Sequence, residues 1–385
     1  MKFEELSKEQ VSKIEKKLMA SWKNNRIFEK SIENREGKKD YVFYDGPATA
    51  NGNPGLHHIV AKFLKDTFCK YQTMQGKRVL RKVGWDTHGL PVEVGVEKQL
   101  GFSGKGDIEK YGIKEFNEKC RESVWANERA FERLTDEMGQ FIDMDNAYVT
   151  YKNEYIETEW WILKKFFDEG LFYEGVKIVP WCPRCGTGLA SHEVAQGYET
   201  ITANTVYVPF KKKDSDEYFL VWTTTPWTLL SNVALCVNPD VDYVKVLSKG
   251  IKFIMAEALV PSVLGDEVEV LEHFKGKDLE YTEFEQLMPF LKVNGKAFYV
   301  TCDDYVTTSD GTGIVHIAPA FGEDDARVCR KYGIGHINPV GEDGCYTEGP
   351  WKGMNIFEAD LKVIDWLRDN DRLFRKQKME HEYPH

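Results

Sequence analysis

The hydrophobic pattern of the chain changes its period about halfway along. Up to about residue 180 most apolar positions recur every three or four residues, which predicts helices over residues 7–24, 106–145 and 153–170. Ser7 and Gln10 have the spacing of a capping box at the start of the first helix. The amino-terminal half is therefore expected to be largely helical.

Two short apolar runs interrupt this half and predict buried strands over residues 41–44 and 79–83. Between them helical spacing extends over residues 58–74, and Gly76 suits the end of that helix. Strand, loop, helix and strand in this order form a unit of a doubly wound parallel sheet, in which ligands bind at the carboxyl edge of the strands. The loops that follow the two strands are therefore candidate binding loops.

Residues 200–345 show another pattern, a series of short β-type runs separated by turn residues at fairly regular spacing. Such a series predicts a small β-rich, barrel-like domain. Helical spacing returns over residues 355–373. The predicted fold class is α/β, with part of a parallel sheet followed by this β-rich domain.

The first candidate loop lies in FYDGPATANGNPGLHH, residues 43–58. Three glycines let the backbone approach a ligand, and two histidines open a helix whose N-terminal N–H groups and dipole favour anions. These residues are Gly46, Gly52, Gly55, His57 and His58. Histidines placed in this way can bind phosphate and stabilise a charged transition state. The alternative is a capped helix with incidental histidines.

The second candidate loop is GWDTHGLPVE, residues 84–93. Gly and Pro break any period there, which predicts a shaped loop rather than a strand or a helix face. Asp86 lies near the end of the predicted strand, where a carboxylate can hold an ammonium group. The alternative role for Asp86 is capping of a turn, which is common for Asp close to Gly.

Composition narrows the class of protein. The 385 residues are enough for two or three domains, and 42% apolar residues are enough for real cores. No run approaches the ~20 apolar residues that a membrane helix needs, and the amino terminus lacks an apolar signal core. Eight cysteines without a secretory signal suit reduced thiols, so a cytoplasmic location is expected. The net charge of -11 gives no sign of a basic nucleic-acid surface, although local basic patches are compatible with it.

Only Cys182 and Cys185 form a close cysteine pair, and their spacing is that of a zinc knuckle. A structural zinc site needs four ligands, and the sequence has no second Cys-x-x-Cys. His192, His381 and His385 are weaker substitutes. A redox role is disfavoured because no thioredoxin-like pattern surrounds the pair. Two thiols alone are expected to bind zinc poorly.

A further pair of motifs lies in the β-rich part, VWTTTPWTLLSN at 221–232 and GTGIVHIAPAFGEDD at 311–325. Consecutive threonines at a strand end offer hydroxyls that can hold a water or a ribose hydroxyl. His316 can line a pocket, and Asp325 can anchor an ammonium group. The ordinary alternatives are that Thr is a good strand former and that GEDD caps a helix.

Together these motifs resemble those of class I aminoacyl-tRNA synthetases, in the wording of the isoleucine-specific members, and the resemblance covers nearly the whole chain. It implies the first half of a Rossmann-type catalytic domain with an inserted β-rich, barrel-like editing domain. The expected parts are residues 1–180 (amino-terminal helix and half-domain), 181–195 (half zinc knuckle and connection), 196–350 (editing domain) and 351–385 (helical return segment).

The resemblance also implies roles for individual residues. In the first site the nucleotide-binding residues are Gly46, Gly52, Gly55, His57 and His58, both histidines being catalytic too. The residues that bind the amino acid there are Pro47, Trp85, Asp86 and His88. In the second site the catalytic residues are Thr224, Thr225 and Asp325, and the binding residues are His316 and Asn232. The family signature His-x-Gly-His reads Gly55-Leu56-His57-His58 in this chain, so only His58 matches by position.

The implied reaction is activation of isoleucine by ATP with magnesium, transfer to tRNA(Ile), and hydrolysis of valyl-tRNA(Ile) formed in error. A monomer that contacts no membrane is expected. The family's second cysteine pair and its Lys-Met-Ser-Lys-Ser loop are expected beyond His385, so the chain alone is not expected to aminoacylate. One alternative is a free-standing editing hydrolase, which has no use for the first two loops. The other is a non-catalytic tRNA-binding module, which the charge of -11 disfavours.

Overall fold

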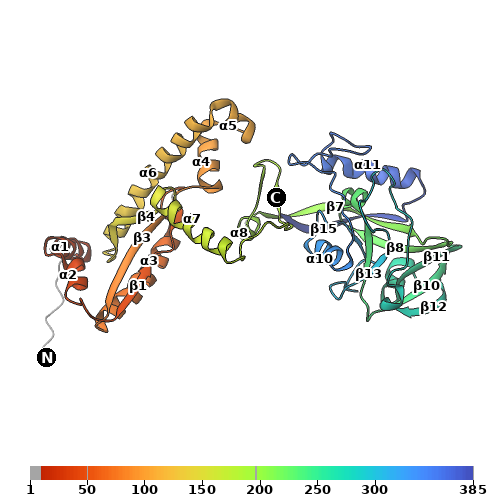
Figure 1. Cartoon of the computed structure of the whole chain (residues 1–385), viewed down its shortest axis with the longest axis horizontal. Helices are drawn as coiled ribbons and strands as arrows, with labels where there is room; N and C mark the ends of the chain where they lie inside the picture. Colours follow the sequence, from red (N-terminus) through yellow and green to blue (C-terminus); the bar gives the residue numbers. More distant parts are fainter. Residues whose placement is uncertain (1–9, 50, 196, 385) are drawn as a thin grey trace. The chain divides into compact units, whose positions relative to one another are not determined.

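The computed structural model describes residues 10–49, 51–195 and 197–384 (Figure 1). The chain divides into two compact units, Met1–Glu174 and Gly175–His385. Among the described residues, no helix combines the length and the apolar character needed to cross a bilayer.

The first unit contains a four-stranded parallel sheet. Its strands are β1 (Asp40–Tyr44), β2 (Ala48–Thr49), β3 (Arg78–Asp86) and β4 (Asp143–Val149). β3 is central, because β1, β2 and β4 all pair with it in parallel. The carboxyl ends of all four strands therefore lie toward one edge of the sheet, where the sequence predicts a ligand site.

Seven helices are described in this unit (Figure 1): α1 (Val11–Asn24), α2 (Ile27–Glu33), α3 (Leu56–Met74), α4 (Leu90–Leu100), α5 (Lys105–Tyr111), α6 (Ile113–Glu137) and α7 (Asn153–Asp168). The buried core is small. Val83 and Trp85 of β3 pack with Phe131 of α6 and Val149 of β4. Both α3 and α7 leave large apolar side chains exposed, Phe63 and Trp160 among them.

Several predicted boundaries in this unit are wrong. α1 begins at Val11, so Gln10 is its N-cap and makes no side-chain capping bond, while Ser7 lies outside the described residues. The GWDTHGLP segment is not a loop throughout, because β3 continues to Asp86 and α4 begins at Leu90. Pairing with β2 and β4 keeps Trp85 in the sheet, an interaction between distant segments that local periodicity does not reveal.

The second unit is built on a six-stranded, mostly antiparallel sheet in the order β12-β10-β11-β8-β7-β15. The strands are β7 (Tyr198–Lys211), β8 (Glu217–Thr223), β10 (Asp242–Ser248), β11 (Ile251–Ala256), β12 (Glu269–Lys275) and β15 (Arg375–Pro384). Only the β11–β8 pair is parallel. A separate three-stranded sheet, β13-β9-β14, consists of β9 (Ala234–Val237), β13 (Val300–Cys302) and β14 (Ile314–Ile317).

The remaining elements of this unit connect and cover the sheets (Figure 1). They are the hairpin β5 (Trp181–Cys182) and β6 (Thr187–Gly188), the α-helices α8 (Ser191–Val194), α9 (Val260–Leu264), α10 (Glu323–Tyr332) and α11 (Ile356–Asp369), and the 3₁₀ helices η1 (Pro226–Ser231), η2 (Glu257–Leu259) and η3 (Gly276–Leu279). One large hydrophobic cluster draws on both sheets, α10 and α11.

The expected barrel is wrong. The six-stranded sheet is open, with β12 at one edge and β15 at the other, and the three other strands form their own sheet. The spacing of short apolar runs predicts how many strands form but not which strands pair. The return segment is likewise helical only over α11, and it continues as β15, which pairs with β7 along ten residues.

Candidate functional site

The parallel sheet brings the loops of the first predicted site to one edge. Asp45 follows β1, His88 follows β3, and Thr150 follows β4. The hydroxyl of Thr150 accepts the Thr87 N–H at 3.0 Å and lies 2.9 Å from His88 Nδ1. A hydrogen-bonded side chain from the neighbouring strand therefore fixes the short turn between β3 and α4.

His57 and His58 lie in the first turn of α3, as the sequence predicts. Their rings lie 3.8 Å apart between centroids with their planes tilted by 42°, and His58 also packs edge-on against Phe131 at 4.8 Å. The backbone N–H of Gly55 donates to His58 Nδ1 at 2.9 Å. A Cβ on Gly55 would lie 2.9 Å from Cε1 of the exposed His57 ring, so a larger residue there would displace this ring.

The electrostatic environment keeps His58 neutral. Burial lowers the pKa of His58, and the neighbouring His57 and Lys62 lower it further. Because Nδ1 accepts the Gly55 N–H, the proton of the neutral ring lies on Nε2. His58 therefore offers an N–H donor at a helix N-terminus, where backbone donors already favour an anion.

The residues predicted to bind the amino acid differ in how deeply their side chains are buried. Trp85 is buried and packs against Phe131 at 6.0 Å. Asp86 is half-buried and accepts the Thr49 hydroxyl at 3.3 Å. Pro47 is exposed. The structure brings Trp85 and Asp86 to the end of β3, while the binding roles of all three residues stay predictions.

Gly46 and Gly52 show no steric need for glycine, since a Cβ at either position would meet nothing within 4 Å. Sequence reasoning missed a charged group beside Gly46. Asp45 is buried, its carboxylate lies 2.5 Å from Lys65 Nζ, and burial lowers the pKa of nearby Lys62 while Asp45 partly opposes that effect. The sequence signal for this group is Lys62 and Lys65, three residues apart on α3, after the strand that Asp45 follows.

A cavity of about 1000 Å³ in this unit lies away from these residues. Its lining comes from α1, α2 and the sheet strands, Trp22, Tyr44 and Lys82 among them. None of the predicted nucleotide-binding residues lines it, so the volume of a cavity does not locate the site here. The convergence of loops at the strand ends is the better guide.

In the second unit the threonine motif forms a chain of hydroxyl groups. Thr223 Oγ1 lies 3.3 Å from Thr225 Oγ1, which lies 3.1 Å from Thr228 Oγ1. Thr228 Oγ1 in turn lies 2.8 Å from His316 Nε2. The structure therefore connects the VWTTTPWT and GTGIVHIAP motifs directly, through Thr228, which sequence reasoning did not single out.

Burial sets the protonation state of His316. It lowers the pKa of His316 to about 4, so the ring is neutral at neutral pH. Thr228 donates its hydroxyl proton to the Thr225 carbonyl at 2.8 Å, so it accepts from His316 Nε2–H. Nδ1 of His316 then carries a lone pair, and it has no hydrogen-bond partner among the described residues. This acceptor is buried, and His316 is not among the residues that line the neighbouring cavity.

Asn232 and Asp325 lie near the same end of the β9–β14 pair, where Asn232 precedes β9 and Ala318 follows β14. Asn232 donates to the Ala234 carbonyl at 2.8 Å, and its Oδ1 has no hydrogen-bond partner in the part of the chain that is described. Asp325, in the first turn of α10, accepts the Ala318 N–H at 2.9 Å, and burial raises its pKa. No hydrogen bond joins either residue to the threonines within the described ranges.

A cavity of about 190 Å³ lies beside Thr224 and Thr225. The side chains that complete its lining come from β7, η1, α11 and β15: Ile201, Thr202, Ala203, Asn204, Trp227, Phe357, Asp360 and Tyr383. Sequence reasoning missed all eight, because the cavity brings together four separate elements, two of which, α11 and β15, follow the threonines by more than 120 residues. Only Trp227 lies within a recognised motif.

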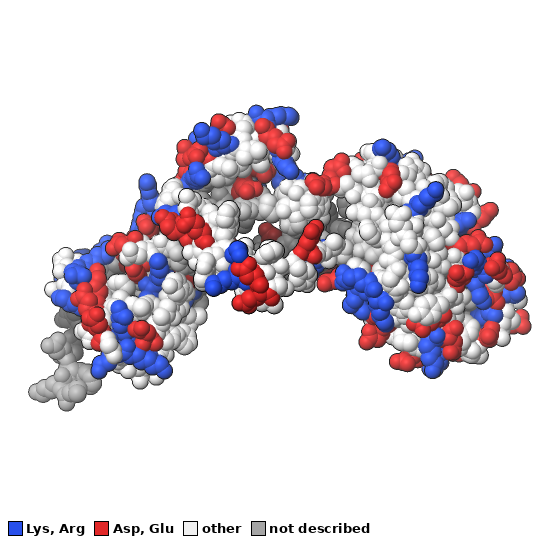
Figure 2. All heavy atoms as spheres, viewed as in Figure 1, with Lys and Arg blue, Asp and Glu red and all other residues white. Residues whose placement is uncertain are grey.

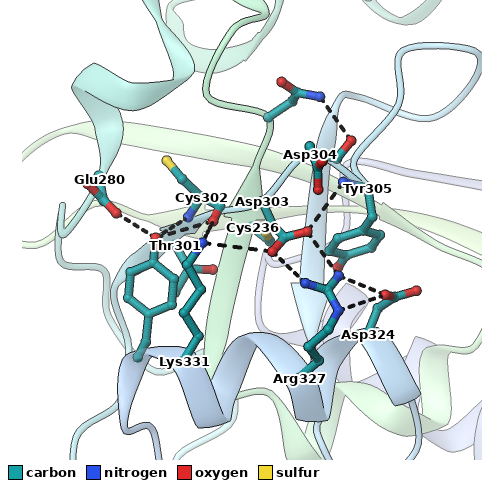
Figure 3. A network of polar contacts seen from close by, with 12 residues as sticks. Cys236, Glu280, Thr301, Cys302, Asp303, Asp304, Tyr305, Asp324, Arg327 and Lys331 are labelled. Carbon is teal, nitrogen blue, oxygen red and sulfur yellow. Dashed lines mark hydrogen bonds and ion pairs between the residues drawn. The ribbon is translucent and has the colours of Figure 1, made fainter.

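A network of polar contacts fixes α10, which carries Asp325 (Figure 3). Arg327 reaches from this helix to Asp303 with bonds of 2.7 and 2.9 Å, and a bond of 2.8 Å to Asp324 within α10 orients its guanidinium. Lys331, one turn further along, donates to the Cys302 carbonyl at 3.2 Å. These contacts tie α10 to the end of β13 and hold Asp325 in place.

The cysteine pair does not form a zinc site with the described residues. Cys182 and Cys185 lie around the β5–β6 hairpin, and burial together with Cys182 raises the pKa of Cys185, which favours the thiol over the thiolate. No group of three or more His, Cys, Asp or Glu side chains within the described ranges can hold a metal ion. His385, and the side chain of His381, lie outside those ranges. A structural zinc needs four ligands, so the residues present do not fit one.

Comparison with known proteins identifies the class. The family model "tRNA synthetases class I (I, L, M and V)" matches residues 17–318. This match extends over more than half of the chain and includes the first candidate site, Thr224, Thr225 and His316, whereas Asp325 lies beyond it. The chain belongs to this family of class I aminoacyl-tRNA synthetases, whose members use ATP.

Individual relatives are isoleucine–tRNA ligases. The one from Clostridium kluyveri is 48% identical over 373 residues, which make up 96% of this chain and 36% of that protein. The one from Streptomyces coelicolor is 48% identical over 379 residues, covering 97% of this chain and 36% of the relative. The chain thus spans about a third of the length of these relatives. A solved structure titled "The crystal structure of GlLeuRS-CP1" aligns with 46% of this chain and 99% of its own, at 16% identity and a TM-score of 0.36, which is too low to establish a shared fold.

Proposed function

We propose that the chain is part of an isoleucine–tRNA ligase and that its second unit hydrolyses valyl-tRNA(Ile). The observation that carries this proposal is the hydrogen-bonded series Thr225, Thr228 and His316 beside a small cavity. The relatives named isoleucine–tRNA ligase support the choice of amino acid.

The need for hydrolysis follows from the chemistry of recognition. A hydrophobic pocket discriminates against a side chain one methylene smaller by only about 10- to 200-fold, and isoleucine against valine is the standard measured case. A second, smaller pocket that hydrolyses the wrong ester corrects the error. The cavity of about 190 Å³ is smaller than ordinary ligand pockets, which start at about 300 Å³, and suits a short aliphatic side chain.

The proposed hydrolysis is attack of water on the ester carbonyl carbon. The bond from that carbon to the ribose oxygen breaks, the ribose oxygen takes a proton, and valine and free tRNA are the products. Thr224 and Thr225 position the ester and the water, and neutral His316 holds Thr228 through Nε2–H. Asp325 binds the substrate ammonium, and Asn232 contributes a free amide oxygen.

For the first unit we infer that the parallel sheet is the first half of a Rossmann-type doubly wound domain. The Nε2–H of His58, with His57 beside it, binds phosphate of ATP at the start of α3, and magnesium neutralises phosphate charge. Asp86 holds the ammonium of isoleucine. The carboxylate of isoleucine then attacks the ATP α-phosphate, which gives isoleucyl-adenylate and pyrophosphate.

The chain spans 36% of the length of its relative from Clostridium kluyveri, so charging of tRNA is proposed for the whole ligase and hydrolysis for the second unit of this chain. The rival reading is a free-standing editing hydrolase, and the polar residues gathered at the edge of the parallel sheet speak against it. Action in the cytoplasm as a monomer stays a prediction.

The test is deacylation of valyl-tRNA(Ile) by the whole chain and by its Asp325→Ala variant. We expect the variant to lose tenfold or more in rate, since an unpaired substrate ammonium costs roughly 1.5–3 kcal/mol. Glu323→Ala is the matched control, because Glu323 is exposed on the same turn of α10. Hydrolysis that is unaffected by Asp325→Ala, or absent in the folded wild type, would overturn the proposal.

A further inference from the structure

Asp360 lines the cavity beside Thr224 and Thr225, although no sequence motif points to it. It lies in α11, which packs against η1, and its side chain is half-buried. The helix therefore brings a carboxylate to the turn that follows the threonines.

The Asp360 carboxylate caps η1 from outside that helix. The Trp227 N–H donates to Asp360 Oδ1 at 3.2 Å, while Thr225, the N-cap residue of η1, makes no side-chain capping bond. Pro226 has no N–H, so Trp227 carries the first free donor of η1. On its other side Trp227 is held by Tyr346, whose hydroxyl donates to the Trp227 carbonyl at 2.6 Å.

We propose that Asp360 is a positioning residue of the hydrolytic site, which orients the turn of Thr225 and Trp227 so that the threonine hydroxyls face the cavity. This inference rests on the proposed hydrolysis. Asp360 lines the cavity, but the proposed role is its hydrogen bond to the Trp227 N–H, whereas the proposed role of Asp325 is to bind the substrate ammonium.

The charge of the Asp360 carboxyl changes near pH 6. Burial raises the pKa of Asp360 to about 6, and the Trp227 N–H, the Asn204 side chain and Lys376 oppose this rise. Lys376 faces it from β15 and Asn204 from β7, and the charge of Asp360 in turn helps to raise the pKa of Tyr346. A carboxylate accepts a hydrogen bond more strongly than a neutral carboxyl, so the cap weakens as pH falls through 6.

The first measurement follows the Trp227 amide, and it needs no substrate. In the whole chain labelled with ¹⁵N-tryptophan, ten tryptophans give a spectrum simple enough to assign Trp227 with the Trp227→Phe variant. We expect its amide shift to titrate with a midpoint near pH 6 in the wild type and in Asp365→Asn, an exposed control on the same helix. We expect no such titration in Asp360→Asn.

The second measurement is the rate of valyl-tRNA(Ile) deacylation between pH 5 and 8. In the wild type the rate constant should fall below a midpoint near pH 6. Asp360→Asn should lower the rate about two- to threefold at pH 7.5 and remove this fall, because an amide oxygen still accepts but does not titrate. Asp360→Ala should lower it about tenfold or more with little change in KM, since no acceptor remains.

The results of these two measurements distinguish the positioning role of Asp360 from the proposed hydrolysis. A Trp227 amide that does not titrate, or an Asp360→Asn variant with the wild-type pH profile of hydrolysis, overturns the positioning role while hydrolysis itself stands. A wild type without any hydrolysis overturns the proposed function, and with it the reaction that Asp360 would position. A higher deacylation rate in Asp360→Asn than in Asp360→Ala is a result that a purely structural role of α11 would not give.

Discussion

His316 makes the folded chain sensitive to acid. Its pKa is lowered to about 4 in the fold, whereas an unfolded chain titrates near 6.5. The unfolded state therefore takes up a proton first as pH falls, and the free energy of unfolding decreases between pH 6.5 and pH 4 by about 3 kcal/mol at the lower end. We expect His316→Gln to lack this part of the decrease.

The measurement is chemical unfolding at pH 7 and pH 4. His336→Gln is the control, because His336 is exposed. The wild type and the control should lose about 3 kcal/mol more than His316→Gln between the two pH values. Equal losses in all three proteins would mean that His316 is accessible to protons in the fold.

For single residues, the sequence indicates which side chains belong to a site more readily than which side chains they contact. The motifs single out Thr225 and His316, and the structure places them two hydrogen bonds apart. Thr228 between them reads as an ordinary helix residue. Asp360 was out of reach of any sequence argument, because its contact with Trp227 joins positions 133 residues apart.

Among the elements, the start of the GWDTHGLP segment depends on close packing of β3 on β4. A Cβ on Gly84 would lie 2.0 Å from Cζ of Tyr148, whose hydroxyl donates to the Asp45 carbonyl. We expect Gly84→Ala to destabilise the first unit by about 1–3 kcal/mol, since the ring must move and lose that bond. Gly95→Ala, in the open interior of α4, should instead stabilise it by about 0.5–1 kcal/mol.

Denaturant unfolding followed by circular dichroism distinguishes the two variants. A Gly84→Ala protein as stable as the wild type would show that β3 and β4 do not pack as closely as described. The sequence predicts the existence of β1, α3, α7 and α11 correctly, because each has a clear period. It misses β4 and β15, since strands of mixed polarity are defined by their pairing partners.

At the scale of the whole molecule, surface charge bears on how well the chain can bind tRNA. Figure 2 shows Lys and Arg interspersed with Asp and Glu over the face drawn, in keeping with the net charge of -11. A nucleic-acid partner binds best to a concentrated basic surface. Recognition of tRNA by this chain is therefore expected to be weak, and hydrolysis should need high concentrations of the aminoacyl-tRNA.

The fold class was predictable as parallel sheet plus β-rich unit, because periodicity reports the type of each element. The barrel was not, since sheet closure depends on which edge strands meet, and β12 and β15 do not pair. The candidate sites were predictable as motifs, while the cavity beside the threonines was not, because four separate elements build it.

The most direct test of the account is the ratio of two deacylation rates by the unmodified chain, with valyl-tRNA(Ile) and isoleucyl-tRNA(Ile) as substrates at equal concentration. The proposed second sieve hydrolyses the smaller valyl ester in preference to one with a further methylene, which predicts that the valyl ester is hydrolysed at least tenfold faster. Equal rates, or faster loss of the isoleucyl ester, would contradict the assignment of this unit as a second sieve.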